Sequence, residues 1–494
     1  MVPMQRFALI DERHVEDTRF LRRALGMPRL VRREPVIDPG QSFGSVLRDN
    51  GGLWRMWYIT FQTRDREKDG VGCATPQHLA YSRDGIRWKK PNLGLVKECG
   101  TKKNNIIIGE HQKDRNGRCL TGYGGMSGMC IFDSTTHPHP KARKRFTALY
   151  GGYPADSIGG ILLMDSDDGI HWEAWAENPI FPGGQDTQNT FVYDARTGKY
   201  VMFHRPMIYC GVPFHANRKM ARCESDDLIH WSPGRVVLDM DEADSPAWDF
   251  FDEPGMNGQR GRIKQFQGLT PWISNGCYLG FTWTYDSRAG TFVTDLVHSP
   301  DGIDWKREAL REPFLAEDRP KGFHGKLPVP NGSPPVLVGD EEYFYVSNTP
   351  YGHHEGALAD LGKGTRKQRG KYLESTSIYG FTIRRDRWIS YDACDREAEF
   401  LSTPFAWEGG KLCLNVQIEK GGQLRVEFED QWARPVKDWH LDEIPPINGP
   451  LDAVDHQLTF GPGPKSIVKV PPVGPIRLRM HLQKARLFGW SCTP

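Results

Sequence analysis

The chain has 494 residues, of which 26% are charged and 38% hydrophobic, and its formal net charge is only +2. This length exceeds what a single hydrophobic core usually fills, so we expect about two domains. The balanced charge lacks the basic surface of a nucleic-acid binder. No apolar stretch of about 18 residues could span a bilayer, so we expect neither a nucleic-acid nor a membrane partner.

The N-terminal segment and the cysteines bear on localisation and cofactors. The first residues, MVPMQRFALIDERHVEDTRF, lack the apolar core of a signal peptide. We therefore expect a cytoplasmic protein, or a secreted or periplasmic one if a leader has been removed. The 10 cysteines form neither a CxxC pair nor a Cys/His cluster at zinc-ligand spacing. We expect free buried thiols and predict no metal or other cofactor.

Four segments repeat one pattern, in which a strand leads into a turn that ends on Trp: AYSRDGIRW, LMDSDDGIHW, RCESDDLIHW and VHSPDGIDW. The Asp of each turn can accept local backbone hydrogen bonds, and the Gly that follows it permits the positive φ of a sharp reversal. The third copy has Leu228 in place of that Gly. The intervals between copies are long enough for four strands, which is typical of propeller blades.

The runs on either side of these turns predict the strands of five blades over about residues 40 to 390. In chain order they are SVLRD and RMWYITF, MCIFD and RFTALY, TFVYD and KYVMFHR, LTPWI and CYLGFTW, then PPVLVGD, EYFYVS and SIYGFTIRRDRWIS. The opening FALIDERHV is interpreted as the outer strand that closes the ring. Helical periodicity is scarce, and 53 Gly and 36 Pro suit many short strands joined by turns.

The pattern changes near residue 400. The later strands KLCLNVQIE, GQLRVEFED, SIVKV and IRLRMHLQKARLFGW alternate without the Asp-containing turn. Such alternation is typical of a two-sheet sandwich. The sequence therefore predicts an all-β chain, with a five-bladed β-propeller over residues 1–398 and a C-terminal β-sandwich over residues 399–494.

Five blades with S-x-D-G-I-x-W turns, KPNLGLVKECGTKKNNIII after the first, and a C-terminal sandwich resemble the propeller glycoside hydrolases of the invertase, levanase and arabinanase type. The resemblance covers nearly the whole chain. It implies a hydrolase of oligosaccharides or glycosides, with furanosides such as fructosides or arabinosides slightly favoured. It also implies a site in the central funnel, where the innermost strand of each blade begins. Two carboxyl groups would flank the glycosidic bond there.

Asp186 is the clearest candidate carboxylate, in GGQDTQNTFVYD ahead of the third inner strand. It resembles the Asp of the Arg-Asp-Pro motif in the invertase-like enzymes, which holds sugar hydroxyls and stabilises the transition state. Gln185 and Thr187 replace the Arg and Pro of that motif. An Asp before a strand also caps loops, which is the structural alternative.

A second acid-rich stretch, DEADSPAWDFFDEPGMNGQRG, precedes the fourth blade. Asp249, Asp252 and Glu253 lie there beside aromatic residues, and apolar surroundings raise a carboxyl pKa toward the range of a general acid. We expect Glu253 to be the proton donor. The alternative is a surface loop with solvated acids.

The first blade departs from the family pattern. The invertase-like enzymes place their nucleophile in an Asn-Asp-Pro-Asn-Gly stretch before the first inner strand, where this chain has Gln41 or Ser42. Asp38, in VIDPGQSFGS, is the nearest carboxylate and could replace the missing Asp. Asp49 is interpreted as an ordinary turn residue.

Candidate substrate-binding residues surround these acids. They are Gln188, His204, Arg205, Trp248, His324 and His354. An Arg can hold a hydroxyl or an anion in fixed geometry, and Trp248, outside any predicted strand, offers a face for sugar stacking. The remaining Trp residues are expected in blade cores. Packing against neighbouring carbonyls or acids is the alternative for His204 and Arg205.

Two further functions remain open on the same scaffold. The missing carboxylate on the first blade is consistent with a propeller that binds carbohydrate without cleaving it. Sugar transfer or phosphorolysis is the other alternative, with Arg and His groups receiving phosphate or an acceptor sugar. The sugar, the linkage, the stereochemical outcome and the oligomeric state are left open by the sequence.

Overall fold

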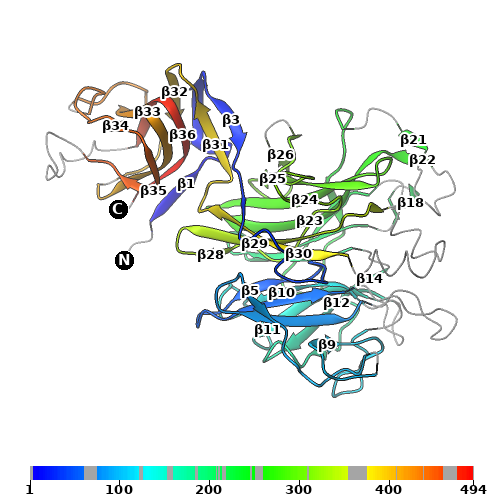
Figure 1. The fold of residues 1–494 in the computed structure, drawn as a ribbon. Coiled ribbons are helices and arrows are strands. Elements are labelled where there is room, and N and C mark those ends of the chain that lie inside the picture. The colour runs from blue at the N-terminus through cyan, green and yellow to red at the C-terminus, as the bar shows by residue number, and fades with distance from the viewer. Residues whose placement is uncertain are drawn as a thin grey trace. The chain divides into compact units, whose positions relative to one another are not determined.

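The structure is a computed structural model with all side chains. It describes residues 4–60, 75–98, 100–121, 126–152, 159–183, 187–206, 208–209, 212–213, 218–244, 248–250, 260–308, 311–353, 375–407, 409–437, 439–459 and 475–492, with backbone alone at 208–209, 212–213, 248–250 and 260–261. These residues form strands and one short 3₁₀ helix, η1 (Glu12–His14). The predicted all-β class is confirmed (Figure 1).

Five antiparallel sheets form the predicted propeller. Blade 1 has β5 (Val46–Arg48), β6 (Trp54–Ile59), β7 (Gln77–Ser82) and β8 (Trp88–Lys89), with β9 (Ile106–Ile108) on β7. Blade 2 has β10 (Met126–Asp133), β11 (Phe146–Gly152), β12 (Gly160–Ser166) and β13 (Glu173–Ala174), with β14 (Phe181–Pro182) on β12. Blade 3 has β15 (Thr190–Asp194), β16 (Lys199–His204), β19 (Met220–Ser225) and β20 (Arg235–Leu238). Two small hairpins, β17 (Ile208–Tyr209) with β18 (Val212–Pro213) and β21 (Trp248–Phe250) with β22 (Arg260–Arg262), follow β16 and β20.

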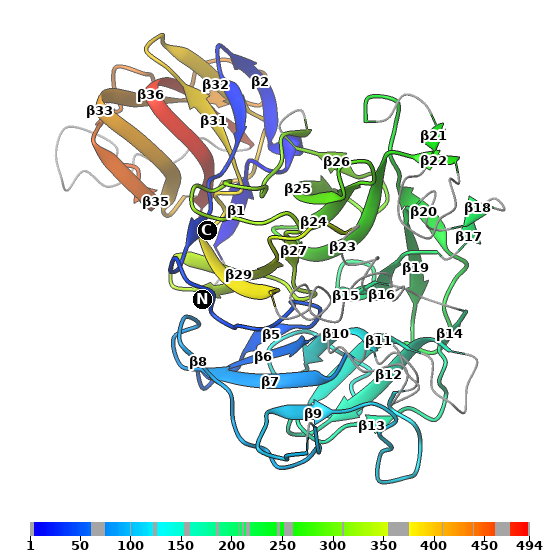
Figure 2. The same ribbon diagram turned by 45° about the vertical axis from the view of Figure 1, so that its right-hand side comes forward.

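Blade 4 has β23 (Lys264–Ser274), β24 (Cys277–Asp286), β25 (Thr291–Ser299) and β26 (Lys306–Arg307). Blade 5 has β27 (Val329–Pro330), β29 (Glu341–Asn348), β30 (Ser377–Arg384) and β4 (Arg29–Leu30), with β28 (Val336–Val338) also on β29. The inner strands β5, β10, β15, β23 and β27 gather around one centre (Figure 2).

Ring closure differs from the prediction. The strand that completes blade 5 is β4, which pairs with β30 through Leu30 and Phe381. The opening segment instead forms β1 (Gln5–Ala8), which pairs with Trp490 and its neighbours near the C-terminus. The expected inner strand PPVLVGD contributes only β28, because β27 takes the inner position on β29.

The repeated turns have the predicted geometry. In the first copy, Asp84 Oδ1 accepts from the backbone N–H groups of Ile86 and Arg87 at 2.8 Å each, and Ser82 Oγ accepts from Gly85 N–H at 3.0 Å. Gly85 has φ +73°, and Leu228 takes the same left-handed region at φ 71°. Trp88 Nε1 then donates to the Gly85 carbonyl at 3.1 Å. The Trp side chain therefore closes the turn that precedes it.

At two places an aromatic side chain of one blade donates a hydrogen bond to the repeated turn of the next blade. Tyr345 of blade 5 donates its hydroxyl to the Gly85 carbonyl of blade 1 at 2.6 Å. Trp57 of blade 1 donates Nε1 to the Gly169 carbonyl of blade 2 at 2.9 Å. Because Trp57, Trp54 and Trp283 are each 1% exposed, the expectation that most Trp residues fill blade cores is confirmed for these positions.

The remaining strands form one nine-stranded sheet: β1, β2 (Val15–Arg19), β3 (Arg22–Leu25), β31 (Ile389–Ala393), β32 (Ala398–Ser402), β33 (Leu412–Asp430), β34 (Ile447–Asn448), β35 (Leu451–Gln457) and β36 (Ile476–Cys492). The register between β33 and β36 breaks between Ile418 and Gln423. Gly421 has φ +75° at this break, and a Cβ on Gly422 would lie 2.6 Å from the Lys484 carbonyl. The long strands thus bend at a glycine corner, and the two layers of the expected sandwich are joined into one curled sheet.

Contacts divide the chain into two units whose bounds differ from those of the two predicted domains. One unit contains residues 28–336 and 343–382, and the other contains residues 1–27, 337–342 and 383–494. The segment RDRWIS, assigned by sequence to the fifth blade, leads into β31, which pairs with β3 and β36. The chain therefore leaves the propeller unit near residue 382 instead of near 398.

Candidate functional site

The five inner strands begin at one end of the ring, which we call the mouth end. Hydrogen bonds tie them at matching levels: Ser45 Oγ to the Met129 carbonyl at 2.9 Å, Thr190 Oγ1 to the Leu269 carbonyl at 2.9 Å, and Gly332 N–H to the Gly44 carbonyl at 2.7 Å. Segments that directly precede the inner strands therefore lead to this end.

Gln188 crosses the ring axis at this level. Its Nε2 donates to the Gly44 carbonyl of blade 1 at 2.9 Å. A Cβ on Gly332 of blade 5 would lie 1.9 Å from the same Nε2. Neither blade is a sequence neighbour of blade 3, so this one amide links opposite sides of the ring. The sequence predicts Gln188 as a substrate-binding residue. In the structure it is buried at the centre of the mouth end, and we call the buried residues at this level the floor.

Two aromatic rings, from Phe43 beside Gly44 and from Trp283 of β24, belong to one buried cluster with Val329 of blade 5. Phe43 and Trp283 stack with their centroids 5.4 Å apart and their planes 19° apart. A Cβ on Gly128 would lie 3.0 Å from the Phe43 Cβ, and one on Gly268 would lie 3.0 Å from the Trp283 ring. Glycines on blades 2 and 4 therefore leave the space that these rings occupy.

Among the described residues, several buried polar side-chain atoms on and beside the inner strands have no hydrogen-bond partner. They are Gln188 Oε1, Asn189 Oδ1, Gln267 Oε1 and Trp283 Nε1. The four residues are 1%, 1%, 8% and 1% exposed. An unsatisfied buried polar atom costs about 1–3 kcal/mol, and native proteins usually satisfy such atoms with water or ligand. Because all four groups are uncharged, they suit water or hydroxyl groups as partners.

Two buried arginines lie beside the start of β23. Arg205 is fully buried and its Nη1 donates to the Gln267 carbonyl at 3.4 Å. The Arg218 carbonyl accepts from Phe266 N–H at 3.2 Å, and its guanidinium lies 5.0 Å from the Tyr285 ring centroid. A guanidinium keeps its charge in proteins, so two buried positive charges lie at this side of the mouth end. Buried charges are stabilised by opposite charges. The acid-rich stretch 241–253 comes shortly before β23 in the sequence.

His204 lies in a different environment from Arg205. Its Nε2 is 3.4 Å from Cys223 Sγ, and its ring packs on Phe181 with centroids 4.8 Å apart. Burial lowers the pKa of His204 to about 4. The side chain is therefore neutral near pH 7 and packs within blade 3.

Asp38 lies away from the inner strands. It is exposed, and its Oδ1 accepts from Ser377 Oγ at 2.9 Å at the start of β30, the third strand of blade 5. Ser42, where the family pattern has its nucleophile, is buried; its Oγ donates to the Val329 carbonyl and lies 2.9 Å from Ser347 Oγ. Asp49 accepts from Leu53 N–H at 2.9 Å and from Arg55 Nη1 at 2.8 Å, as expected of a turn residue.

The other predicted site residues are described partly or not at all. Asp186, Asp252, Glu253 and His354 lie outside the described residues. Trp248 and Asp249 are described as backbone only, in β21, so the expectation that Trp248 lies outside any strand is wrong. His324 is exposed, and its carbonyl accepts from Asn348 Nδ2 at 3.3 Å.

Sequence reasoning missed three residues near the mouth end: Phe43, Gln267 and Arg218. Gln267 lies at a register shift between Phe266 and Gly268. Such a bulge redirects one side chain, and the Gln before a Gly was the available signal.

Two wider searches cover only the described part of the chain. Among those residues, no group of three or more His, Cys, Asp or Glu is arranged to hold a metal ion. Within the same ranges, no helix has the length and apolar character needed to cross a membrane.

Comparison with known proteins gives matches of structure only. No protein-family model matches the chain, and no curated protein sequence matches it. A thermostable family-43 glycoside hydrolase is 11% identical over 73% of this chain and 89% of its own, with a TM-score of 0.44. The β-1,2-mannobiose phosphorylase from Listeria innocua is 13% identical over 72% of this chain and 96% of its own, also at 0.44. An N-acetylgalactosamine deacetylase from F. plautii is 13% identical over 74% and 95%, at 0.41.

Proposed function

We propose that this chain is a glycoside-acting enzyme that takes an oligosaccharide or glycoside at the mouth end and attacks its glycosidic bond with paired carboxylates. One observation supports this most. The neighbouring inner strands β15 and β23 are level with each other through the bond from Thr190 to Leu269, 2.9 Å long. We therefore infer that the acid-bearing segments before these two strands lie at the same end of the ring.

The roles follow from the chemistry of glycoside cleavage. We propose Glu253 as the proton donor, Asp186 as the group that holds sugar hydroxyls, and Asp249 or Asp252 as the nucleophile or base. Arg205 and Arg218 would favour the ionised form of the nucleophile or base, because a nearby positive charge favours the charged form, whereas Glu253 has to hold its proton. Asp38 ranks last, since it is bound to Ser377 beside an outer strand.

A second reaction has a specific observation in its favour. The buried guanidiniums of Arg205 and Arg218 add positive charge at the mouth end. Arginine binds phosphate as well as carboxylate. Attack by inorganic phosphate instead of water would make the enzyme a phosphorylase, and this alternative needs no carboxylate on the first blade.

The test is a cleavage screen on aryl glycosides and oligosaccharides of fructose, arabinose, galactose and glucose, with and without inorganic phosphate. Wild type is compared with Asp186→Asn, Glu253→Gln and the exposed turn variant Asp167→Asn as control. Loss of a general acid reduces the rate about 10²–10⁴-fold. We expect losses of that size for Asp186→Asn and Glu253→Gln and none for Asp167→Asn.

Each outcome separates the alternatives. Activity that requires phosphate would identify the phosphorylase. Full activity in both acid variants would overturn the site. Calorimetric binding of a sugar without turnover of any substrate would identify a propeller that binds carbohydrate without cleaving it.

A further inference from the structure

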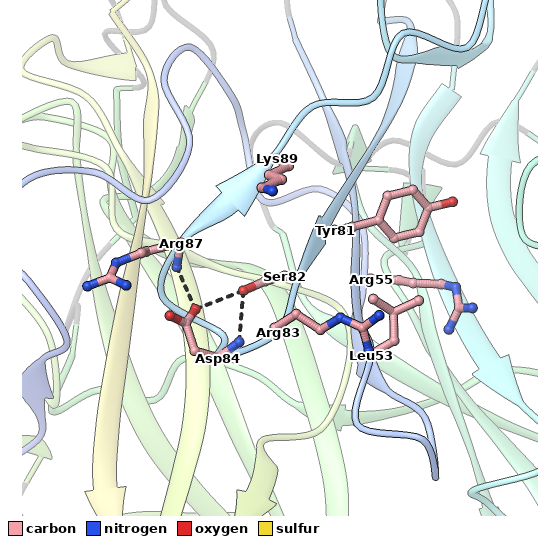
Figure 3. Close-up of a pocket in the computed structure, with 8 residues that line it drawn as sticks. All are labelled: Leu53, Arg55, Tyr81, Ser82, Arg83, Asp84, Arg87 and Lys89. Atoms are coloured by element: carbon pink, nitrogen blue, oxygen red, sulfur yellow. Dashed lines mark hydrogen bonds between the residues drawn. The ribbon is translucent and has the colours of Figure 1, made fainter.

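A pocket of about 540 Å³ opens on blade 1 at the opposite end of its strands from the mouth end. It lies between the start of β6 and the turn that joins β7 to β8 (Figure 3). Its walls include Leu53, Arg55, Tyr81, Arg83, Arg87 and Lys89. Small-molecule sites have volumes of about 300–1,000 Å³, so the pocket is large enough for a sugar.

The pocket has more basic side chains than acidic side chains that are paired with them. Arg55 is paired with Asp49 at 2.8 Å. Asp84, the acid of the pocket, accepts backbone bonds of 2.8 Å from Ile86 and Arg87, so its carboxylate is held by the turn. Within the described part of the chain, Arg83, Arg87 and Lys89 form no ion pair. An anion could therefore bind without displacing an internal partner.

The turn does not need these basic residues for its fold. At the position of Arg83 the other three turns have Asp167, Asp226 and Pro300, and at the position of Arg87 they have His171, His230 and Asp304. In each copy the Asp carboxylate accepts hydrogen bonds from the backbone N–H groups two and three residues later. At the position of Lys89, blade 2 has Glu173, which is paired with Lys144 and Arg115. Unpaired positive charge is thus a property of blade 1 and not of the repeat.

The shape of the pocket indicates the class of ligand. Figure 3 shows Arg55, Arg83, Leu53 and Tyr81 on one side of the turn, with Arg87 on the other. Guanidinium groups bind phosphate and sulfate oxygens in a forked geometry. The Tyr81 ring and Leu53 offer apolar surface to the C–H groups of a sugar ring.

We propose that this pocket binds a sugar-sized ligand that carries a phosphate or sulfate ester. The ester lies between Arg83 and Lys89, and the sugar ring contacts Tyr81. The site is separate from the mouth end, so it stands or falls independently of the proposed glycoside chemistry.

The test is calorimetric titration of the full chain with glucose 6-phosphate, glucose 6-sulfate and glucose. We expect at least one ester to bind and glucose not to bind, and the ester preferred identifies the source of the anion. Arg83→Asp with Lys89→Glu places the residues of the blade 2 turn into blade 1, so folding should be retained. Binding should weaken about tenfold or more, because two charge-assisted contacts are lost. If that variant fails to fold, Arg83→Gln with Lys89→Gln replaces it.

The matched control is Lys102→Glu with Lys103→Glu, which makes the same change in net charge at two exposed residues of the same blade outside the pocket. We expect it to bind the ester like wild type. Equal weakening in the control and the pocket variant would overturn the proposal by showing a long-range charge effect. Failure of both esters to bind wild type, or unchanged affinity in the pocket variant, would also overturn it.

Discussion

Gln188 and Gly332 occupy adjoining space at the centre of the ring, although they belong to blades that are not neighbours. A Cβ on Gly332 would lie 1.9 Å from Gln188 Nε2, while that same nitrogen donates to the Gly44 carbonyl at 2.9 Å. The absence of a side chain at one position and the length of the side chain at the other are therefore coupled. The Gln188 side chain therefore fills the space beside Gly332 at the centre of the ring.

Replacing Gly332 with alanine tests this coupling. We expect Gly332→Ala to destabilise the propeller by about 1–3 kcal/mol through overpacking. In a Gln188→Ala background the same change should cost less, because the clashing nitrogen is gone. Urea unfolding of the four proteins in this double-mutant cycle measures the coupling. Purely additive effects would show that the two residues do not share space.

The bond between blades 5 and 1 predicts a second effect. Tyr345→Phe removes the hydroxyl that donates to the Gly85 carbonyl at 2.6 Å and leaves that buried carbonyl without this donor. We expect a loss of about 1–2 kcal/mol in the free energy of unfolding. Tyr193→Phe is the control, because that half-buried tyrosine has no hydroxyl hydrogen bond among the described residues. Similar losses in both variants would contradict a role for the bond between the blades.

Replacing Leu228 tests whether burial or backbone strain has the larger effect on stability at the third turn. Leu228 has φ 71°, where the other copies have Gly, and it is fully buried. Leu228→Gly should relieve about 1–2 kcal/mol of left-handed strain but lose at least about 2–5 kcal/mol of packing. We expect net destabilisation in thermal unfolding. A variant more stable than wild type would show that strain outweighs burial here.

His204 predicts a dependence of stability on pH. Burial lowers its pKa to about 4 from an ordinary value of 6.5. Below pH 6.5 the unfolded chain therefore takes up a proton that the folded state refuses, and stability falls as the pH drops from 6.5 toward 4. The loss by pH 4 is about 3 kcal/mol for a shift of this size.

Replacing His204 measures that contribution. His204→Gln should flatten the decline in unfolding free energy between pH 6.5 and 4, whereas His324→Gln, at an exposed position, should leave it unchanged. An identical pH profile in wild type and His204→Gln would show that the histidine does not titrate with folding.

The turn chemistry could be predicted from sequence because its contacts are local. Asp84, Ser82 and Trp88 bond within a few residues of Gly85, so the pattern S-x-D-G-x-x-W contains every partner. The absence of a carboxylate on the first inner strand was also visible, since it depends on the identity of Gln41 and Ser42. The roles proposed for Asp186 and Glu253 remain predictions.

The failures of prediction at the ends of the chain and at ring closure involve partners that are distant in sequence. β1 pairs with β36 across nearly the whole chain, and nothing in the residues from Gln5 to Ala8 distinguishes that partner from an outer blade strand. Likewise, β4 has two residues, too few for any periodic signal. The bend of β33 against β36 at Gly421 could not be predicted, because a Gly within an alternating strand does not indicate which strand pairs with it.

The sequence by itself determined the all-β class, the number of blades and the chemistry of the repeated turns, because hydrogen bonds within a turn depend on adjacent residues. Only the tertiary structure decided which strand completes the ring, how Gln188 reaches blades 1 and 5 across its centre, and that Arg55 and Arg83 share a pocket. Those relationships arise from packing between residues far apart along the chain. Such packing depends on space and register, which no single segment specifies.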